Sequence, residues 1–535
     1  MSITSSNSHS VNDTNDVMHV HSESISPKKN DLDIELGESV VEPHLSNNSI
    51  AKLDTYELEE NEDISDYAYK LAGISNEHPA HPQNWGWWKK AYIVLLSTSL
   101  QMYVFWTPNF YPGVQDSVME LWHLSSQVSL LGQSMFVLGV ALGPLFLGPL
   151  SDLLGRKLVY IGSLIIYVCF CISCALARNY AQLVISMLIM GVVGSTALGN
   201  VAGAVADVLG DEDSNWGMYM FIFMCSVASV GSPMGTGVAE NPKLTWRWLY
   251  WIDVIVGGFF IILFVFTPET LPAIVIQRYE QKRQGLPVSW FPQFSLKKLA
   301  KDTYFVFFMA IKIFFSEPIV SSLGIYNGFV NGLLYFFLQA IWPVYFSIYK
   351  MSDMAASCTY MAAMPACVIL LWFEPLQCWL YKRDKRKHQN RLRPEARFIM
   401  TLFYVWGFPI GIFMFAFCSK VHIHYIVSLI GLTIFNIADY HIWQAMLLYV
   451  TDAYPNVSAS AVAAFELPSN LGAVGFIHLS ALMFSRMNVH WATAVVGFAS
   501  LPLIALIYAL YFYGDRIRAR SKLASQRVPI NTAAH

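Results

Sequence analysis

Apolar residues occur along most of the chain in stretches of about 20 residues or more, separated by polar segments. A helix of about 20 apolar residues crosses a hydrocarbon core about 30 Å thick. We place the membrane-spanning helices at 91–112, 128–150, 157–177, 181–205, 217–239, 248–267, 317–346, 355–378, 397–418, 423–449, 457–484 and 490–513. The pattern therefore predicts an all-α membrane protein with twelve transmembrane helices.

Polar segments divide these helices into two groups of six. Residues 1–88 are polar and have no apolar period, which predicts a disordered cytoplasmic tail. The further divisions are an N-terminal six-helix bundle (89–268), a central cytoplasmic loop (269–316), a C-terminal six-helix bundle (317–513) and a second cytoplasmic tail (514–535). In the central loop, 303–316 contains only Lys312 among apolar residues. We expect an amphipathic helix on the inner surface there, with a thirteenth partial span as the alternative.

The lysines and arginines indicate the orientation of the chain. With the N-terminus inside, 28 of the 34 lie on the cytoplasmic side. Positive residues accumulate in cytoplasmic loops, so both termini are expected in the cytoplasm.

Composition agrees with membrane residence and narrows the function. Hydrophobic residues make up 55% of the chain and charged residues only 13%, whereas about a quarter of residues in soluble domains are charged. The net charge of −3 gives no polybasic signature, so nucleic acid is not an expected partner. The sequence has no metal-ligand cluster, nucleophile elbow or Walker loop. We expect neither an enzyme nor an ATP-driven pump, and no cofactor or metal.

One loop carries a specific motif. Residues 148–157 read Gly-Pro-Leu-Ser-Asp-Leu-Leu-Gly-Arg-Lys, which resembles the G-x-L-x-D-x-x-G-R-K loop between helices two and three of the major facilitator superfamily. The resemblance implies that this loop latches a closed state and does not contact substrate. The implied gating residues are Gly148, Asp152, Gly155, Arg156 and Lys157, together with Asp207 at the inner end of helix four.

Further motifs resemble the fungal twelve-span drug:proton antiporter branch, which includes multidrug and polyamine exporters. Trp246–Trp251 opens helix six and Pro268–Thr270 closes it. In helix five, Gly231, Pro233 and Gly235 are similar to the antiporter kink, although a plain packing kink is the alternative. The resemblance implies two six-helix bundles that rock about a central site.

The sequence departs from that branch at several buried positions. Met187, Gln339 and Pro468 stand where close relatives often carry a charge, which puts the usual proton relay in doubt. Charges that remain at bilayer depth are functional by default because burying them is costly. Asp439 in helix ten and Glu466 in helix eleven are therefore the proton-coupling candidates.

Helices one, four, seven and ten line the central cavity in this superfamily. An aromatic and carboxylate pocket suits an organic cation through cation-π contact and charge pairing. The substrate-binding candidates on these helices are Gln101, Tyr103, Trp106, Asn200, Asn327, Asn331, Tyr335, Asn436 and Asp439.

These features predict a monomeric secondary transporter of the plasma membrane, with the vacuolar membrane less favoured. Its expected partners are protons, the lipid bilayer and a small organic cation or drug, such as a polyamine, which it exports in exchange for protons. Two alternatives stay open. The first is proton-coupled uptake or uniport of such cations, and the second is a transporter-like nutrient receptor without net flux.

Overall fold

A computed structural model describes residues 78–285, 287, 296–388, 393–454, 458–519, 521 and 524. Most of the expected N-terminal tail, residues 1–77, and most of the C-terminal tail lie outside the described residues. Within them the secondary structure is entirely helical.

Helices follow one another with short connections in the N-terminal half. After the 3-10 turn η2 (Pro82–Asn84) come α2 (Trp87–Trp122), α3 (Ser126–Ser129), α4 (Leu131–Leu154), α5 (Arg156–Ala175), α6 (Tyr180–Gly194), α7 (Thr196–Val227), η3 (Ala228–Val230), α8 (Gly231–Glu240) and α9 (Arg247–Phe266). Two helices, α10 (Pro272–Arg283) and α11 (Leu296–Ser316), then connect this half to the next.

The C-terminal half repeats the arrangement. Its elements are α12 (Pro318–Trp342), the π-helical turn η4 (Pro343–Ile348), α13 (Asp353–Cys358), η5 (Thr359–Ala362), α14 (Ala363–Lys387), η6 (Pro394–Phe398), α15 (Thr401–Tyr404), α16 (Gly407–Cys418), α17 (Tyr425–Ala453), α18 (Ser458–Arg486) and α19 (Val489–Arg518).

Eleven helical segments among the described residues are long and apolar enough to cross a membrane, and they correspond to the predicted spans two to twelve. The predicted first span, 91–112, lies in α2, which is not one of the eleven. Polar residues and two prolines, Pro108 and Pro112, dilute its apolar character. α2 nevertheless has 36 residues and packs against α7 and α8. The count of twelve stays a prediction.

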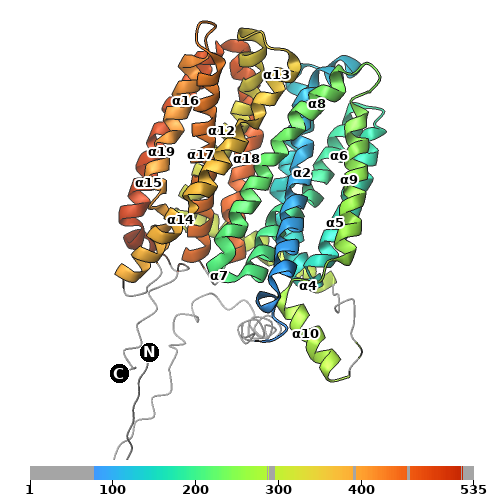
Figure 1. Ribbon diagram of the computed structural model, residues 1–535, viewed down its shortest axis with the longest axis vertical. Coiled ribbons are helices and arrows are strands. Elements are labelled where there is room, and N and C mark those ends of the chain that lie inside the picture. The colour runs from blue at the N-terminus through green and yellow to red at the C-terminus, as the bar shows by residue number, and fades with distance from the viewer. Residues whose placement is uncertain are drawn as a thin grey trace, which may run out of the picture. The chain divides into compact units, whose positions relative to one another are not determined.

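Two large hydrophobic cores follow the two halves of the chain. One gathers side chains mainly from α2 and from α4 to α9, and the other mainly from α11, α12 and α16 to α19. Cys367 of α14 joins the first core and Met218 of α7 joins the second. In Figure 1 the helices of the first half (blue to green) lie beside those of the second (yellow to red). The closest packing of the second half joins α12 to α18, where Gly328 faces the backbone of Gly472 and of Pro468.

Helix five is interrupted one turn before its proline. The 3-10 turn Ala228–Val230 separates α7 from α8, and Pro233 has no N–H to donate to the carbonyl four residues earlier. Small residues also let α8 approach α2 closely. A Cβ on Gly235 would lie 2.5 Å from the carbonyl oxygen of Phe110, and one on Gly231 would strike the ring of Trp106.

Candidate functional site

The long helices run between two ends of the molecule (Figure 1). The lower end is the end at which α2 begins, α10 lies and α19 terminates. The upper end is the end at which α8 terminates and α13 begins.

A cavity of about 170 Å³ lies between the two halves. Its wall is built mainly by α2, α7, α12, α17 and α18, with smaller contributions from η5 and α14. The residues of the sequence prediction that line it are Gln101, Asn327, Asn331, Tyr335, Asn436, Asp439 and Glu466. The cavity therefore brings together most of the predicted substrate-binding residues and both proton-coupling candidates.

The amide side chains of this cavity differ in how they are satisfied. Asn331 donates to the hydroxyl of Ser469 at 3.1 Å, and Asn436 donates to a backbone carbonyl within its own helix. Gln101 and Asn327 are fully buried, and their four polar amide atoms have no hydrogen-bond partner of good geometry in the described part of the chain, although the thiol of Cys225 lies beside Gln101. A buried amide without a partner is costly, so these groups are available to a polar solute or to water.

Two carboxylates face the cavity in different settings. Glu466 accepts a hydrogen bond of 3.1 Å from the indole N–H of Trp443. Asp439 is 5% exposed and lies near the middle of α17. None of the described lining residues is a lysine or an arginine, so the wall favours a cation or a proton over an anion.

Three predicted substrate-binding residues lie outside the lining of the cavity. The hydroxyl of Tyr103 donates to the backbone carbonyl of Asp253 in α9 at 2.7 Å. Trp106 packs on Gly231, and Asn200 accepts from the hydroxyl of Ser151 at 3.1 Å. These side chains face neighbouring helices of their own half, because a position near a cavity-lining residue in sequence does not fix the face of the helix on which it lies.

The predicted gating loop lies at the lower end. The guanidinium of Arg156 donates from Nε to Asp207 at 2.6 Å, and the ion pair is largely buried. Asp152 lies close enough to attract the same guanidinium. Gly203 leaves room for that group, because a Cβ there would lie 2.7 Å from it. The Arg156–Asp207 ion pair thus joins the loop to the lower end of helix four.

Glu269, in the Pro-Glu-Thr segment after helix six, holds the same loop from the other side. Its carboxylate accepts from the backbone N–H groups of Arg156 at 2.9 Å and Lys157 at 3.2 Å, and also from those of Thr270 and Leu271. Gly155 has a φ of +92° and passes so close that a Cβ would meet this carboxylate. The sequence prediction assigned Glu269 no role in the loop, although its motif had been noted.

The remaining loop residues have simpler surroundings. The ammonium of Lys157 donates to the carbonyl of Val265 at 2.7 Å. The carbonyl of Gly148 accepts from the hydroxyl of Ser151, and no heavy atom lies within 4 Å of the position of a Cβ on this glycine. Gly148 is therefore not required by close packing.

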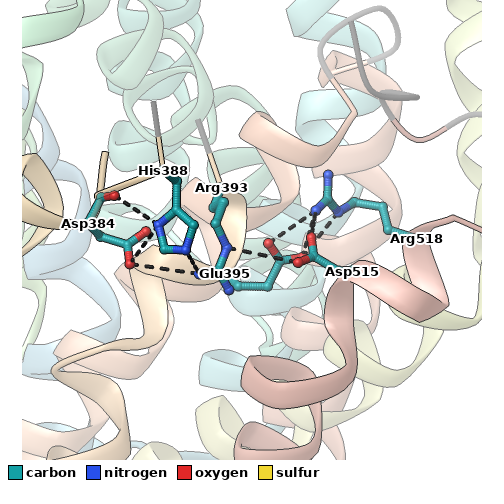
Figure 2. A network of polar contacts seen from close by, with 6 residues as sticks. All are labelled: Asp384, His388, Arg393, Glu395, Asp515 and Arg518. Atoms are coloured by element: carbon teal, nitrogen blue, oxygen red, sulfur yellow. Dashed lines mark hydrogen bonds and ion pairs between the residues drawn. The ribbon is translucent and has the colours of Figure 1, made fainter. Parts of the chain in front are cut away.

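The lower end of the second half has an ion-pair network of its own (Figure 2). Arg518 at the end of α19 contacts both carboxylate oxygens of Glu395 in η6, at 2.9 and 3.1 Å. Burial raises the pKa of Glu395, and the Arg518 guanidinium opposes that shift. Arg397, next along η6, donates to Asp452 at the end of α17 at 2.8 Å. These pairs join α17 and α19 to the chain between α14 and α15.

The two halves contact each other on both sides of the cavity. On the upper side Gln339 donates to Gln133 at 2.9 Å, and His478 is hydrogen-bonded to the hydroxyl of Ser134 at 3.0 Å. On the lower side the ring of Trp443 stacks on that of Phe221, with 6.2 Å between centroids. Gln339, one of the neutral positions of the sequence analysis, thus joins the two halves directly.

The second neutral position, Met187, lies in the core of the first half. Its sulfur accepts from the hydroxyl of Tyr250 at 3.7 Å. The third, Pro468, packs against Gly324 and Gly328 where α18 crosses α12. These positions serve packing between helices.

The sequence profile of the major facilitator superfamily matches residues 94–477. The chain belongs to the major facilitator superfamily. It is a membrane transporter of that family. The vitamin B6 transporter bsu1 of Schizosaccharomyces pombe is 44% identical over 495 residues, a match that covers 92% of this transporter and 93% of the relative. The multidrug transporter FLU1 of Candida albicans is 28% identical, with 85% and 76% covered.

Solved structures give the same fold for the transporter. The proton:xylose symporter XylE has a TM-score of 0.58 at 14% identity, with 80% of this chain and 97% of that chain covered. The predicted membership of the superfamily and the all-α membrane fold are therefore confirmed.

Proposed function

We propose that this transporter carries a small, weakly basic aromatic solute of the vitamin B6 type into the cell together with protons. The observation that supports it most directly is the composition of the cavity wall, which has two carboxylates, unpartnered amides and aromatic rings, and no basic side chain among the described lining residues. The 44% identity to a vitamin B6 transporter favours the same substrate class.

The size of the cavity supports a small solute. A drug-sized ligand occupies a pocket of about 300–1,000 Å³, whereas this cavity measures about 170 Å³. The B6 vitamers are single pyridine rings with hydroxyl and hydroxymethyl substituents. A cavity of this size favours a single ring over a multidrug substrate.

The chemistry of the wall also matches such a ring. A protonated ring nitrogen would pair with the carboxylate of Asp439. The free amides of Gln101 and Asn327 would exchange hydrogen bonds with the hydroxyl substituents. Tyr335 and Tyr440 line the same cavity and offer rings for stacking.

Proteoliposomes test this proposal. An inward proton gradient should drive uptake of labelled pyridoxine, and an excess of unlabelled pyridoxine should compete. Uptake that ignores the gradient would leave uniport and refute proton coupling. Extrusion of a labelled polyamine or cationic drug without pyridoxine flux would favour the export function. The similarity to multidrug transporters supports that alternative. Flux of none of these by folded protein would favour the receptor.

A matched pair of variants tests the role of Asp439. Asp439→Asn should abolish uptake while leaving the amount of folded protein unchanged, because the amide cannot pair with a protonated ring nitrogen. Asp116→Asn is the control, since that carboxylate is exposed near the upper end of α2. Normal uptake by Asp439→Asn would remove Asp439 from the substrate site. We also propose that the protein works as a monomer in the plasma membrane, which a fluorescent fusion and its sedimentation in detergent would check.

A further inference from the structure

Trp443 is the side chain around which the lower side of the cavity is organised. It lies on α17 one turn below Asp439 and lines the cavity. Its side chain is partly buried and packs against the hydrophobic cores of both halves. Nothing in the sequence distinguishes it, because an indole in an apolar helix resembles an ordinary packing residue.

The indole makes two different contacts at once. Its ring is nearly parallel to that of Phe221 on α7, with an interplanar angle of 14°, and this contact joins the two halves on the lower side. Its N–H donates to the carboxylate of Glu466 on α18. One rigid side chain therefore connects an acidic group of the cavity to the contact between the halves.

We infer that Trp443 transmits the charge state of Glu466 to the lower contact between the two halves, so that protonation of Glu466 releases the Trp443–Phe221 stack and opens the lower side. A hydrogen bond from an N–H to an ionised carboxylate is about twice as strong as one to a neutral oxygen. Ionised Glu466 therefore holds the indole in the orientation that stacks on Phe221, and protonated Glu466 holds it less firmly.

The surroundings of the pair support this coupling. Asp439 and Glu466 are the charged residues among the described cavity lining. The other titratable groups that line it are Cys225 on α7, Tyr335 on α12, Tyr360 on η5 and Tyr440 on α17. None of these described groups donates a hydrogen bond to Glu466, whose hydrogen bond comes from Trp443.

In the transport cycle this arrangement gives protons a direction. A proton that reaches Glu466 from the upper side weakens the lower contact, and loss of that proton to the lower side restores it. This inference rests on the proton coupling proposed above, but its test needs no substrate.

The experiment measures the lower opening as a distance in the purified full-length protein in lipid nanodiscs. Spin labels on non-natural amino acids at Gln277 in α10 and Lys382 in α14, both exposed at the lower end, leave the eight native cysteines in place. The fraction of molecules in the long-distance, open population is read from double electron-electron resonance.

Two variants weaken or remove the same hydrogen bond from opposite ends. Glu466→Gln removes the charge, and Trp443→Phe keeps a ring on Phe221 but removes the N–H. Each should raise the ratio of open to closed molecules about tenfold, the order expected for a hydrogen bond to a charged group. The double variant should open no further than either single variant.

Trp342→Phe is the matched control, because Trp342 also stacks on a phenylalanine, Phe346, but lies in the upper part of the second half. It should leave the open fraction unchanged. If Trp443→Phe does not fold, Phe221→Leu replaces it, and the double-mutant cycle is measured with Phe221→Leu and Glu466→Gln. Additive effects, or an open fraction unmoved by Glu466→Gln, would overturn the inference. Absence of pyridoxine flux would refute the substrate proposal and leave this measurement unaffected.

Discussion

The ion pair between Arg156 and Asp207 predicts which of three variants loses the most stability. At the 2.6 Å between Arg156 and Asp207, the direct attraction is about 6 kcal/mol for an effective dielectric constant of about 20. Desolvation of both groups offsets much of it. Removing one partner of a buried pair nevertheless costs about 3–5 kcal/mol, because the other charge is left uncompensated.

The neighbours of the pair make the two single variants unequal. Arg156→Gln removes the guanidinium that attracts both Asp207 and Asp152 and should cost about 4 kcal/mol of unfolding free energy. Asp207→Asn leaves Arg156 beside Asp152 and should cost about 2 kcal/mol. The double variant has one fewer buried charge than Arg156→Gln alone. We expect it to be the more stable of those two, by about 1–2 kcal/mol.

Reversible unfolding of the purified transporter in mixed micelles measures these differences. Arg178→Gln is the control, since that arginine is exposed at the opposite end of α5 and should change stability by less than about 0.5 kcal/mol. If the double variant loses the sum of the two single losses, the groups are independent and the assignment of the pair as a coupled latch is wrong.

Three further predictions concern contacts elsewhere in the fold. Arg518→Lys should lower the unfolding free energy by about 1–3 kcal/mol, because the guanidinium donates to Glu395 from both Nε and Nη2 and an ammonium has a single nitrogen. Arg516→Lys is its control, and equal losses would show that the paired geometry is unimportant. Gly235→Ala should lower the unfolding free energy by about 1–3 kcal/mol, since its Cβ would meet the backbone of α2. Gly199→Ala is the control, because no heavy atom lies within 4 Å of a Cβ there, and it should be neutral. The midpoint of thermal unfolding compares the two variants. Glu269→Gln should increase proteolysis at the 148–157 loop, because the amide presents a donor to a backbone N–H, and an unchanged cleavage rate would contradict its role.

The helices of this fold could be predicted well from the sequence. Spans two to twelve were placed within a few residues over their apolar parts, because the apolar length needed to cross a bilayer is a strong signal. Their ends were less well placed. α14 continues to Lys387 and α19 to Arg518, well past the last apolar residues, because a helix that leaves the membrane continues with charged residues.

The cavity was predictable only in part. Asn327, Asn331 and Tyr335 lie four residues apart on one helical face, and that spacing placed all three correctly in its wall. Tyr103 and Trp106 are close in the sequence to the cavity-lining residues Gln101 and Phe105 but face other helices. The neighbours of a helix decide which face meets the cavity, and one sequence does not specify those neighbours.

The acidic wall of the cavity also has an electrical consequence. An empty carrier whose carboxylates are ionised carries negative charge through part of the membrane field as it reorients, and a carrier loaded with protons or a cation carries less. A potential of 100 mV changes the free energy of each elementary charge that crosses the membrane by about 2.3 kcal/mol. For the proton-coupled uptake proposed above, a voltage that is negative inside therefore favours the outward return of the empty carrier, and a potassium diffusion potential should increase uptake even when the pH is equal on both sides.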